Sequence, residues 1–331
     1  MSQATLFGAA EPPGTEPFVQ PAEPTAELLA LAQALDGRWG SRLHLGTSSW
    51  HFPGWAGLVW HRACAQPELS RYGLAAYARH PLLRTVSLDR AFHQPLDATT
   101  YRRYTAQVDE AFRFVVKAPA AVSDAVLRTG SRDAALQGNP RFLDPRAALE
   151  LCVKPALEGL GAKLGVLVFQ ISPLSQRWLV PGALIGRLET LWQAVVPALP
   201  THTRVALELR DAELLTPTLC ASLKAHGVRL CLGLHDRMPA IDAQLPAQRA
   251  LWPGDLVCRW NLQRGLRYTQ AKELWEPFNR LQAPDPATRS TLARVLRATL
   301  DAGHHAFVTI NNKAEGSAPL SVLELARALR A

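Results

Sequence analysis

The sequence lacks any segment suited to crossing a membrane or to export through one. No apolar run approaches the roughly 18 residues that a transmembrane helix needs. Residues 1–17 carry no positive charge and no apolar core, so they do not have the features of a secretory signal. We therefore expect a cytoplasmic protein.

Cysteines are also few, and none of them form a C-x-x-C pair. The chain has five, an odd number at wide spacing, which argues against a disulfide framework and a zinc knuckle. Cys231 and Cys258 lie in apolar runs and are expected to be buried thiols that act as small hydrophobic side chains. The chain has neither a G-x-S-x-G nucleophile elbow nor a P-loop, so neither chemistry is indicated.

Basic residues are missing from the amino-terminal part of the chain. Residues 1–37 contain five acids and no lysine or arginine, so the formal charge of +8 leaves +13 on the rest. Such a body is expected to attract a polyanion or a small anionic ligand. A well-solvated basic surface is an equally good interpretation.

The amino-terminal segment is also poor in large apolar side chains. Its first 25 residues contain five prolines and cannot bury enough surface to offset the entropy of ordering, which predicts a disordered tail. A short helix is expected from Ala26 to Leu35, ending at Gly37. We therefore expect a largely disordered, Pro-rich acidic tail over 1–37 and one domain over 42–331.

Within this tail lies the pentapeptide Gln3-Ala4-Thr5-Leu6-Phe7. It resembles the short Q-x-x-L-F peptide with which bacterial proteins bind the replication sliding clamp. The resemblance implies recruitment to that clamp as a partner.

Beyond the tail, short apolar runs recur at intervals long enough for a helix. Their almost continuous apolar content is typical of parallel strands buried on both faces. The eight runs are 43–48, 85–89, 112–117, 163–170, 204–210, 228–236, 256–261 and 305–312.

The segments between the runs include clear helical patterns. Helices are expected over 145–161, with a kink or break at Pro155, and over 287–302 and 320–329. Eight strands that alternate with helices predict an α/β fold, a single (β/α)₈ TIM-like barrel. A doubly wound open sheet is the alternative, without support because no Gly-rich fingerprint follows an early strand. Residues 122–144 are expected to form a long loop over the barrel mouth.

Candidate catalytic residues follow from the barrel, because functional side chains gather at the carboxyl ends of its strands. Glu208 and Arg210 are two residues apart and share one face of the fifth strand, so Glu208 is expected to meet Lys117 or Arg259. We assign proton transfer to Glu208, Lys117 and Asp236, and an anion clamp to Lys117, Arg210 and Arg259. In the alternative interpretation, the charges form a closed ring of ion pairs that only fills the barrel top.

Other polar or aromatic side chains at strand ends are candidates for substrate binding. Trp50 directly follows a strand end and is suited to stacking on a planar ligand. Together with Arg210 and Arg259, the substrate-binding candidates are Thr47, Trp50, Asp89, His93, Asn311 and Asn312.

A metal site has little support in the sequence. No H-x-H or H-E-x-x-H spacing gathers the plausible ligands, and the neighbouring cations would oppose a divalent ion. These ligands would be Glu208, Asp236, Asp89, His93 and His235. We therefore expect no metal, and the sequence indicates no particular cofactor.

Several segments resemble one known family. The stretch LHLGTSSWHFPGWAGLVW is similar to the opening signature of the YecE-like proteins (domain of unknown function 72), and FRFVVKAP, KLGVLVFQISP, RVALELR, VCRWN and FVTINNKAEGSAPLSVLELA follow in the family's order. The resemblance covers the chain from Leu43 to the C-terminus and implies a TIM-like barrel without an established activity. The family's mouth residues correspond here to Thr47, Trp50, Lys117, Glu208, Arg210, Arg259, Asn311 and Asn312.

The chain departs from the family pattern at five positions. Ser87 replaces an acid, Asp89 an asparagine and His93 a tyrosine. Asp124 and Asp211 stand where histidines are usual. If these positions are catalytic in the family, the resemblance implies that this member has diverged or lost that activity.

Two hypotheses on function follow. The first is an enzyme that acts on a small phosphate- or carboxylate-bearing substrate by general acid/base chemistry. The second is a nucleic-acid-associated protein recruited to the sliding clamp through its QATLF peptide, with binding that weakens steeply with salt. Neither hypothesis involves a membrane.

Overall fold

A computed structural model describes residues 19–127, 137–180 and 182–330. The QATLF peptide lies outside these ranges. No helix in them is long and apolar enough to span a bilayer.

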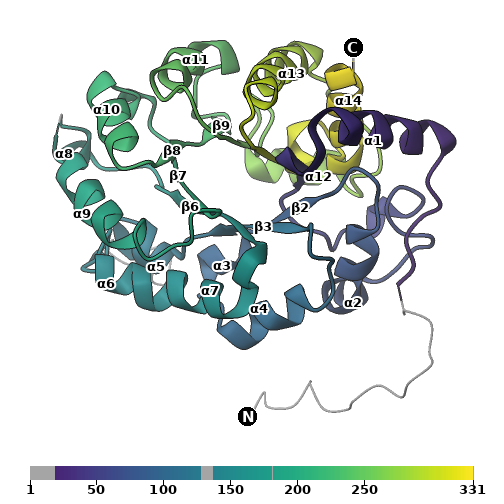
Figure 1. Ribbon diagram of the computed structural model, residues 1–331, viewed down its shortest axis with the longest axis horizontal. Helices are drawn as coiled ribbons and strands as arrows, with labels where there is room; N and C mark the ends of the chain where they lie inside the picture. Colours follow the sequence, from purple (N-terminus) through teal and green to yellow (C-terminus); the bar gives the residue numbers. More distant parts are fainter. Residues whose placement is uncertain (1–18, 128–136, 181, 331) are drawn as a thin grey trace.

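Nine of the described strands form one parallel sheet closed into a barrel (Figure 1), with the order β8-β7-β6-β3-β2-β1-β11-β10-β9. Parallel pairing of β1 with both β2 and β11 lies in the middle of this order. The strands are β1 (Leu43–Thr47), β2 (Thr85–Leu88), β3 (Arg113–Lys117), β6 (Leu164–Gln170), β7 (Arg204–Glu208), β8 (Arg229–Leu230), β9 (Leu232–Leu234), β10 (Leu256–Trp260) and β11 (Ala306–Ile310).

Strands β8 and β9 are two parts of one strand, interrupted only at Cys231. β8 pairs with β7 and β9 pairs with β10. The Cys231 amide bridges the interruption by donating to the Leu207 carbonyl at 2.8 Å. The ring therefore has eight strand positions, one in each apolar run of the sequence. The predicted (β/α)₈ class is confirmed, and the open-sheet alternative is excluded.

Helices surround the barrel in the described part of the chain (Figure 1). The predicted helices over 287–302 and 320–329 are present, each shifted by no more than two residues at either end. The helices are α1 (Ala26–Trp39), α2 (Gln66–Ala78), α3 (Arg90–His93), α4 (Ala98–Thr105), α5 (Ala120–Ser123), α6 (Pro145–Ala148), α7 (Lys154–Leu160), α8 (Gln176–Leu179), α9 (Ile185–Val195), α10 (Pro217–Ala225), α11 (Ile241–Ala250), α12 (Tyr268–Trp275), α13 (Pro286–Asp301) and α14 (Ala318–Arg330).

The helix predicted at 145–161 is distorted before Pro155, as expected. A π-helical turn, Leu149–Val153, separates α6 from α7. Proline has no amide hydrogen to donate to the carbonyl four residues earlier, and its ring clashes with that carbonyl. The wider turn is the local response to these two effects.

Residues 19–39 pack against the barrel, which the sequence did not predict. Helix α1 continues past Gly37 to Trp39 and lies beside α14 (Figure 1). The Trp39 indole is buried and donates to the Asp301 carboxylate of α13 at 2.7 Å. Before the helix, Val19 is buried and the Ala22 amide donates to the Val59 carbonyl. Leu31, Leu35 and Trp39 form the buried face of α1, but the groups that they pack against come from distant parts of the chain, so the local pattern did not reveal the packing.

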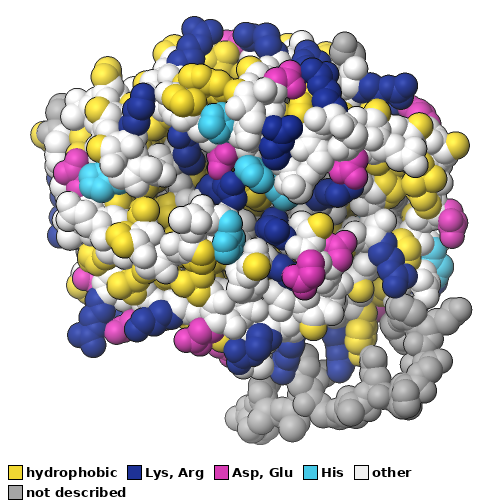
Figure 2. Space-filling view, in the orientation of Figure 1, with side chains coloured by type: hydrophobic (Ala, Val, Ile, Leu, Met, Phe, Trp, Pro, Cys, Tyr) yellow, Lys and Arg dark blue, Asp and Glu magenta, His cyan; other side chains and the backbone are white. Residues whose placement is uncertain are grey.

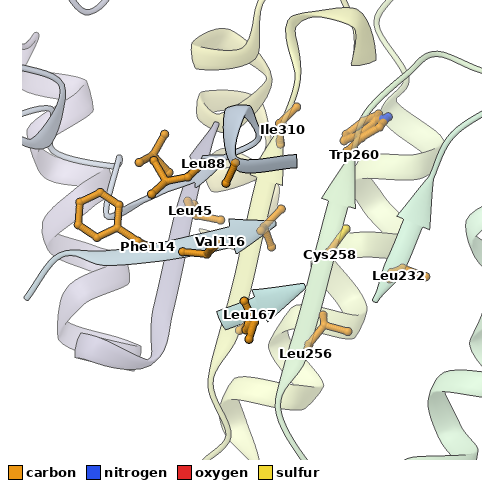
Figure 3. Close-up of a cluster of buried hydrophobic side chains, with 14 of the residues drawn as sticks. Leu45, Leu88, Phe114, Val116, Leu167, Leu232, Leu256, Cys258, Trp260 and Ile310 are labelled. Carbon is orange, nitrogen blue, oxygen red and sulfur yellow. The ribbon is translucent and has the colours of Figure 1, made fainter. Parts of the chain in front are cut away.

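Two apolar layers hold the barrel together. Its inside is filled by small and branched side chains around Phe307, with Val115, Val166 and Val257 among them. The layer between strands and helices includes Leu45, Cys258 and Trp260, drawn in Figure 3. Cys231 belongs to the inner layer and Cys258 to the outer one, so both thiols are buried as predicted.

The segment 122–144 is only partly described. It contains the end of α5 and a short antiparallel pair, β4 (Val126–Leu127) with β5 (Gln137–Gly138). The described part of the segment contributes no side chain to the cavity at the barrel mouth, where we had expected it to lie.

Candidate active site

A cavity of about 600 Å³ opens at the carboxyl ends of the strands. Every one of the eight strand positions contributes a lining residue at or just after its end. In barrel order, these are Ser48, Asp89, Lys117, Gln170, Arg210, His235, Arg259 and Asn311. The position of the cavity is therefore a direct consequence of the parallel barrel.

Glu208 lies beneath this cavity with no exposed surface, and both its carboxylate oxygens are occupied. Oε1 accepts from Arg210 Nη1 at 2.6 Å and from Asn261 Nδ2 at 3.0 Å. Oε2 accepts from Arg259 Nη1 at 3.0 Å. Burial alone would raise the pKa of this carboxyl, but Arg210, Arg259 and Lys117 outweigh it and hold the pKa at about 2. Glu208 is thus a fixed anion at neutral pH.

Arg259 connects Glu208 to a second carboxylate across the mouth. Its Nη2 donates to both oxygens of Asp89, at 2.7 and 2.8 Å. The Ser87 hydroxyl lies 2.6 Å from Asp89 Oδ1 and donates to it. Although burial opposes its charge, Asp89 and Glu208 raise the pKa of the Arg259 guanidinium further above its ordinary value. Ser87 and Asp89, two departures from the family pattern, therefore belong to one network with Arg259.

Arg210 is also held in place, by a second contact besides Glu208. Its Nη2 donates to Gln170 Oε1 at 3.1 Å. The side chain is buried and still lines the cavity. The expected meeting of Glu208 with Arg259 is therefore observed, together with a contact to Arg210 that the sequence placed only on the same face.

Lys117 lines the same cavity but makes no ion pair or hydrogen bond through its amine within the described ranges. The amine lies 3.7 Å from the centre of the Phe92 ring. Burial lowers the pKa of Lys117 to about 8, with Arg259 and Arg210 adding to the shift while Asp89 and Glu208 oppose it. Only 8% of the residue is exposed, so its ammonium is desolvated without a counter-ion.

Lys313 is a second such amine, and it was not among the residues that we selected from the sequence. It is 3% exposed, lines the cavity and lies 4.1 Å from the centre of the Tyr268 ring. Burial lowers its pKa to about 8, and nearby Lys272 adds to the shift. Its place three residues after the end of β11 was the available signal. Tyr268 is contributed by the loop and helix after β10, where the sequence held no comparable signal.

Three more of the predicted residues line the cavity: Trp50, His93 and Asn311. The Trp50 indole nitrogen donates to the Leu69 carbonyl at 3.1 Å, which fixes the ring in the wall. The Asn311 amide donates to the Ser48 hydroxyl at 2.7 Å.

Thr47, Asn312 and Asp236 do not line the cavity. The Thr47 hydroxyl is buried against the Tyr77 hydroxyl at 2.8 Å. Asn312 Oδ1 accepts from the Trp55 indole at 3.1 Å and from the first amide of α14 at 2.8 Å. Thr47 and Asn312 therefore make structural contacts. Each is the sequence neighbour of a lining residue, Ser48 or Asn311, and side chains one residue apart at a strand end point in opposite directions.

Asp236 is instead paired with its neighbour His235, whose Nδ1 contacts Asp236 Oδ1. Burial and the nearby Arg210 lower the pKa of His235 to about 4, so its imidazole is neutral at pH 7.

Two of the family departures, Asp124 and Asp211, also lie outside the cavity lining. Asp211 accepts from the Leu174 amide at 2.8 Å and from Arg237 at 3.4 Å, which joins the loops after β6 and β9. Within the described ranges, no three His, Cys, Asp or Glu side chains are grouped so that they could hold a metal ion.

The fold is shared with two solved proteins. One is the DUF72 family protein TM1631 from Thermotoga maritima, with 18% identity, a TM-score of 0.58 and coverage of 87% of this chain and 99% of that one. The other is the DUF72 family protein EF0366 from Enterococcus faecalis, with 16% identity, a TM-score of 0.56 and coverage of 87% and 96%. No curated protein matches the sequence.

The family comparison covers nearly the whole barrel. The model for the protein of unknown function DUF72 matches residues 44–331, from the second residue of β1 to the end of the chain. This agrees with the resemblance noted in the strand-end motifs. The chain belongs to the DUF72 family.

Proposed function

We propose that the protein is an enzyme that acts on a small phosphate- or carboxylate-bearing substrate at the mouth of its barrel. One observation carries the proposal: Lys117 and Lys313 are buried in the cavity wall and neither has a carboxylate partner within the described ranges. A buried cation without a partner is costly, so such a site favours an anion that would complete it.

The charge balance of the cavity supports an anionic ligand. Five cationic side chains line it: Arg90, Lys117, Arg210, Arg259 and Lys313. Only Asp89 in the lining and Glu208 beneath it are carboxylates, which leaves an excess of three positive charges. A cleft of one sign concentrates and orients ligands of the opposite sign.

The geometry favours roles for Glu208 and Lys117 that differ from those expected from the sequence. Glu208 has no exposed surface and a pKa of about 2, so it is a poor proton acceptor near neutral pH. We assign it the role of a positioning residue for Arg210 and Arg259. Lys117 has a pKa of about 8 and faces the cavity, which suits it to proton transfer near pH 7 to 8. Asp236 is given no catalytic role in this proposal.

Isothermal titration calorimetry with inorganic phosphate and with pyruvate tests the proposal. We expect Lys117→Met and Lys313→Met each to weaken binding at least about tenfold, since a charge-assisted contact contributes roughly 1.5–3 kcal/mol. Lys224→Met is the matched control, because Lys224 is exposed and its amine donates to the Trp252 carbonyl, away from the cavity. Absence of binding, or equal binding by all three variants, would contradict an anion site at the mouth.

The nucleic-acid hypothesis gains no comparable support. Figure 2 shows lysine and arginine side chains spread over one face of the molecule with carboxylates between them, rather than gathered in a single stripe. Backbone binding to nucleic acid depends on such a continuous basic surface. The clamp-like peptide remains a separate prediction, because it lies outside the described residues.

A further inference from the structure

The Lys117 amine is arranged as a nucleophile as well as a charge. The Phe92 ring covers one side of it, with its centre 3.7 Å from the amine, and the residue lines the cavity. Within the described ranges, no carboxylate or carbonyl binds the amine. A lysine that serves only as a structural cation would be expected to have such a partner.

The charged groups around Lys117 keep its amine available. Asp89, Glu208, Arg210 and Arg259 face it, and both carboxylates are already engaged by the two guanidinium groups. The arginines therefore take the counter-ions that would otherwise stabilise an ammonium at this position. A desolvated lysine next to other cations is the usual arrangement for an amine that attacks carbonyl carbon.

We propose that Lys117 forms an imine with the carbonyl group of a small anionic substrate of the 2-oxo acid type. This inference rests on the proposed function and names the substrate class for that same cavity. Lys313, the second amine without a carboxylate partner in the described ranges, holds the substrate's carboxylate. The Tyr268 ring beneath Lys313 leaves that amine facing the same cavity.

The chemical step is balanced without a redox partner. The neutral Lys117 amine adds to the carbonyl carbon, and one proton moves from its nitrogen to the former carbonyl oxygen to give a neutral carbinolamine. The hydroxyl takes up one further proton and leaves as water, while the nitrogen lone pair forms the carbon–nitrogen double bond. The net change consumes one carbonyl, one amine and one proton, and releases one water and a protonated imine. The imine then withdraws electrons from the carbon next to the imine carbon, C3 of the substrate, which eases loss of a proton or a carboxyl group that C3 carries.

Reductive trapping tests this inference directly. The chain contains six lysines, so the labelled position can be assigned among few candidates. The full-length protein is incubated at pH 7.5 with pyruvate or glyoxylate and sodium cyanoborohydride, which reduces the protonated imine to a stable secondary amine. Peptide mass mapping then locates the adduct. We expect one adduct per chain at Lys117, formed about a hundred times faster than at the exposed Lys154, Lys224 and Lys272, since the neutral fraction of an amine rises about tenfold for each unit by which its pKa falls.

Variants and a competing anion complete the design. Lys117→Met should remove the fast adduct, whereas Lys224→Met should retain it, and inorganic phosphate should slow it by occupying the cavity. If phosphate binds at the mouth but neither oxo acid labels Lys117, the imine is wrong and the anion site stands. If phosphate does not bind either, both proposals are wrong. The inference is also wrong if Lys313 is labelled faster than Lys117, or if Lys117 is labelled no faster than the exposed lysines.

Discussion

Arg259 and Asp89 are joined by one guanidinium nitrogen that donates to both carboxylate oxygens, at 2.7 and 2.8 Å. They lie 170 positions apart in the sequence, on β10 and directly after β2, and only closure of the barrel brings them together. The same guanidinium holds Glu208 at 3.0 Å. A network at the barrel mouth therefore joins Asp89 and Glu208 through the single buried guanidinium of Arg259.

Loss of the Glu208 charge should destabilise the protein. Glu208→Gln leaves the buried guanidinium groups of Arg210 and Arg259 without their shared anion. Breaking a buried ion pair from one side costs about 3–5 kcal/mol. We expect the free energy of unfolding in urea to fall by about that amount at pH 7. A loss below about 1 kcal/mol would show that the network contributes little to stability.

The same substitution should lose its effect in acid. The pKa of Glu208 is about 2 in the folded protein and 4.5 ordinarily, so its ionised form stabilises the fold fully above pH 4.5. As the pH falls from 4.5 towards 2, Glu208 takes up a proton in the unfolded chain but stays ionised in the folded one, so the wild type loses stability. The stability gap between wild type and Glu208→Gln should then narrow, by about 1.4 kcal/mol per pH unit. Urea unfolding at pH 7, 5 and 3.5 measures it, and a constant gap would refute the assignment.

Replacement of Lys117 should raise the free energy of unfolding, whereas replacement of Glu208 lowers it. Its pKa is about 8 in the folded state and 10.5 ordinarily, so the folded protein disfavours the charged amine below pH 8. Lys117→Met should raise the free energy of unfolding at pH 7 by about 2–3 kcal/mol. The gain should shrink between pH 8 and 10.5, where wild type becomes more stable as the amine loses its proton. Denaturation at pH 7 and pH 10 tests this. A gain that does not change with pH would place the effect in packing.

Asn312 should matter for stability and not for the ligand. Its Oδ1 accepts from Trp55 and from the first amide of α14, so Asn312→Ala leaves both buried donors without an acceptor. Each unsatisfied donor costs about 1–3 kcal/mol. We expect a lower melting temperature and unchanged phosphate affinity of the folded protein. Weaker phosphate binding with an unchanged melting temperature would restore the ligand role expected from the sequence.

Much of the architecture could be predicted, because each buried parallel strand can be recognised in the sequence as a short apolar run. Each of the eight runs contains an observed strand, and Pro155 disturbs its helix for a reason that the residue itself carries. The helix expected from Ala26 to Leu35 is present within α1, but the packing of residues 19–39 against the barrel could not be read in this way. Val19 and Trp39 are buried only because the barrel offers them neighbours from distant parts of the chain.

The candidate site, too, was predictable from the sequence only in part. The sequence determined that Lys117, Glu208, Arg210 and Arg259 are aimed at one mouth, since alternation along a strand and the common direction of the strands are local properties. Only the tertiary structure decided which of these charges are neutralised. It closed both oxygens of Glu208 with donors from the end of β10 and from its own strand end, and it left the amines of Lys117 and Lys313 facing the cavity without a carboxylate partner in the described ranges. The physical reason is that desolvation and pairing depend on the distances among side chains far apart in the sequence, whereas strand direction does not.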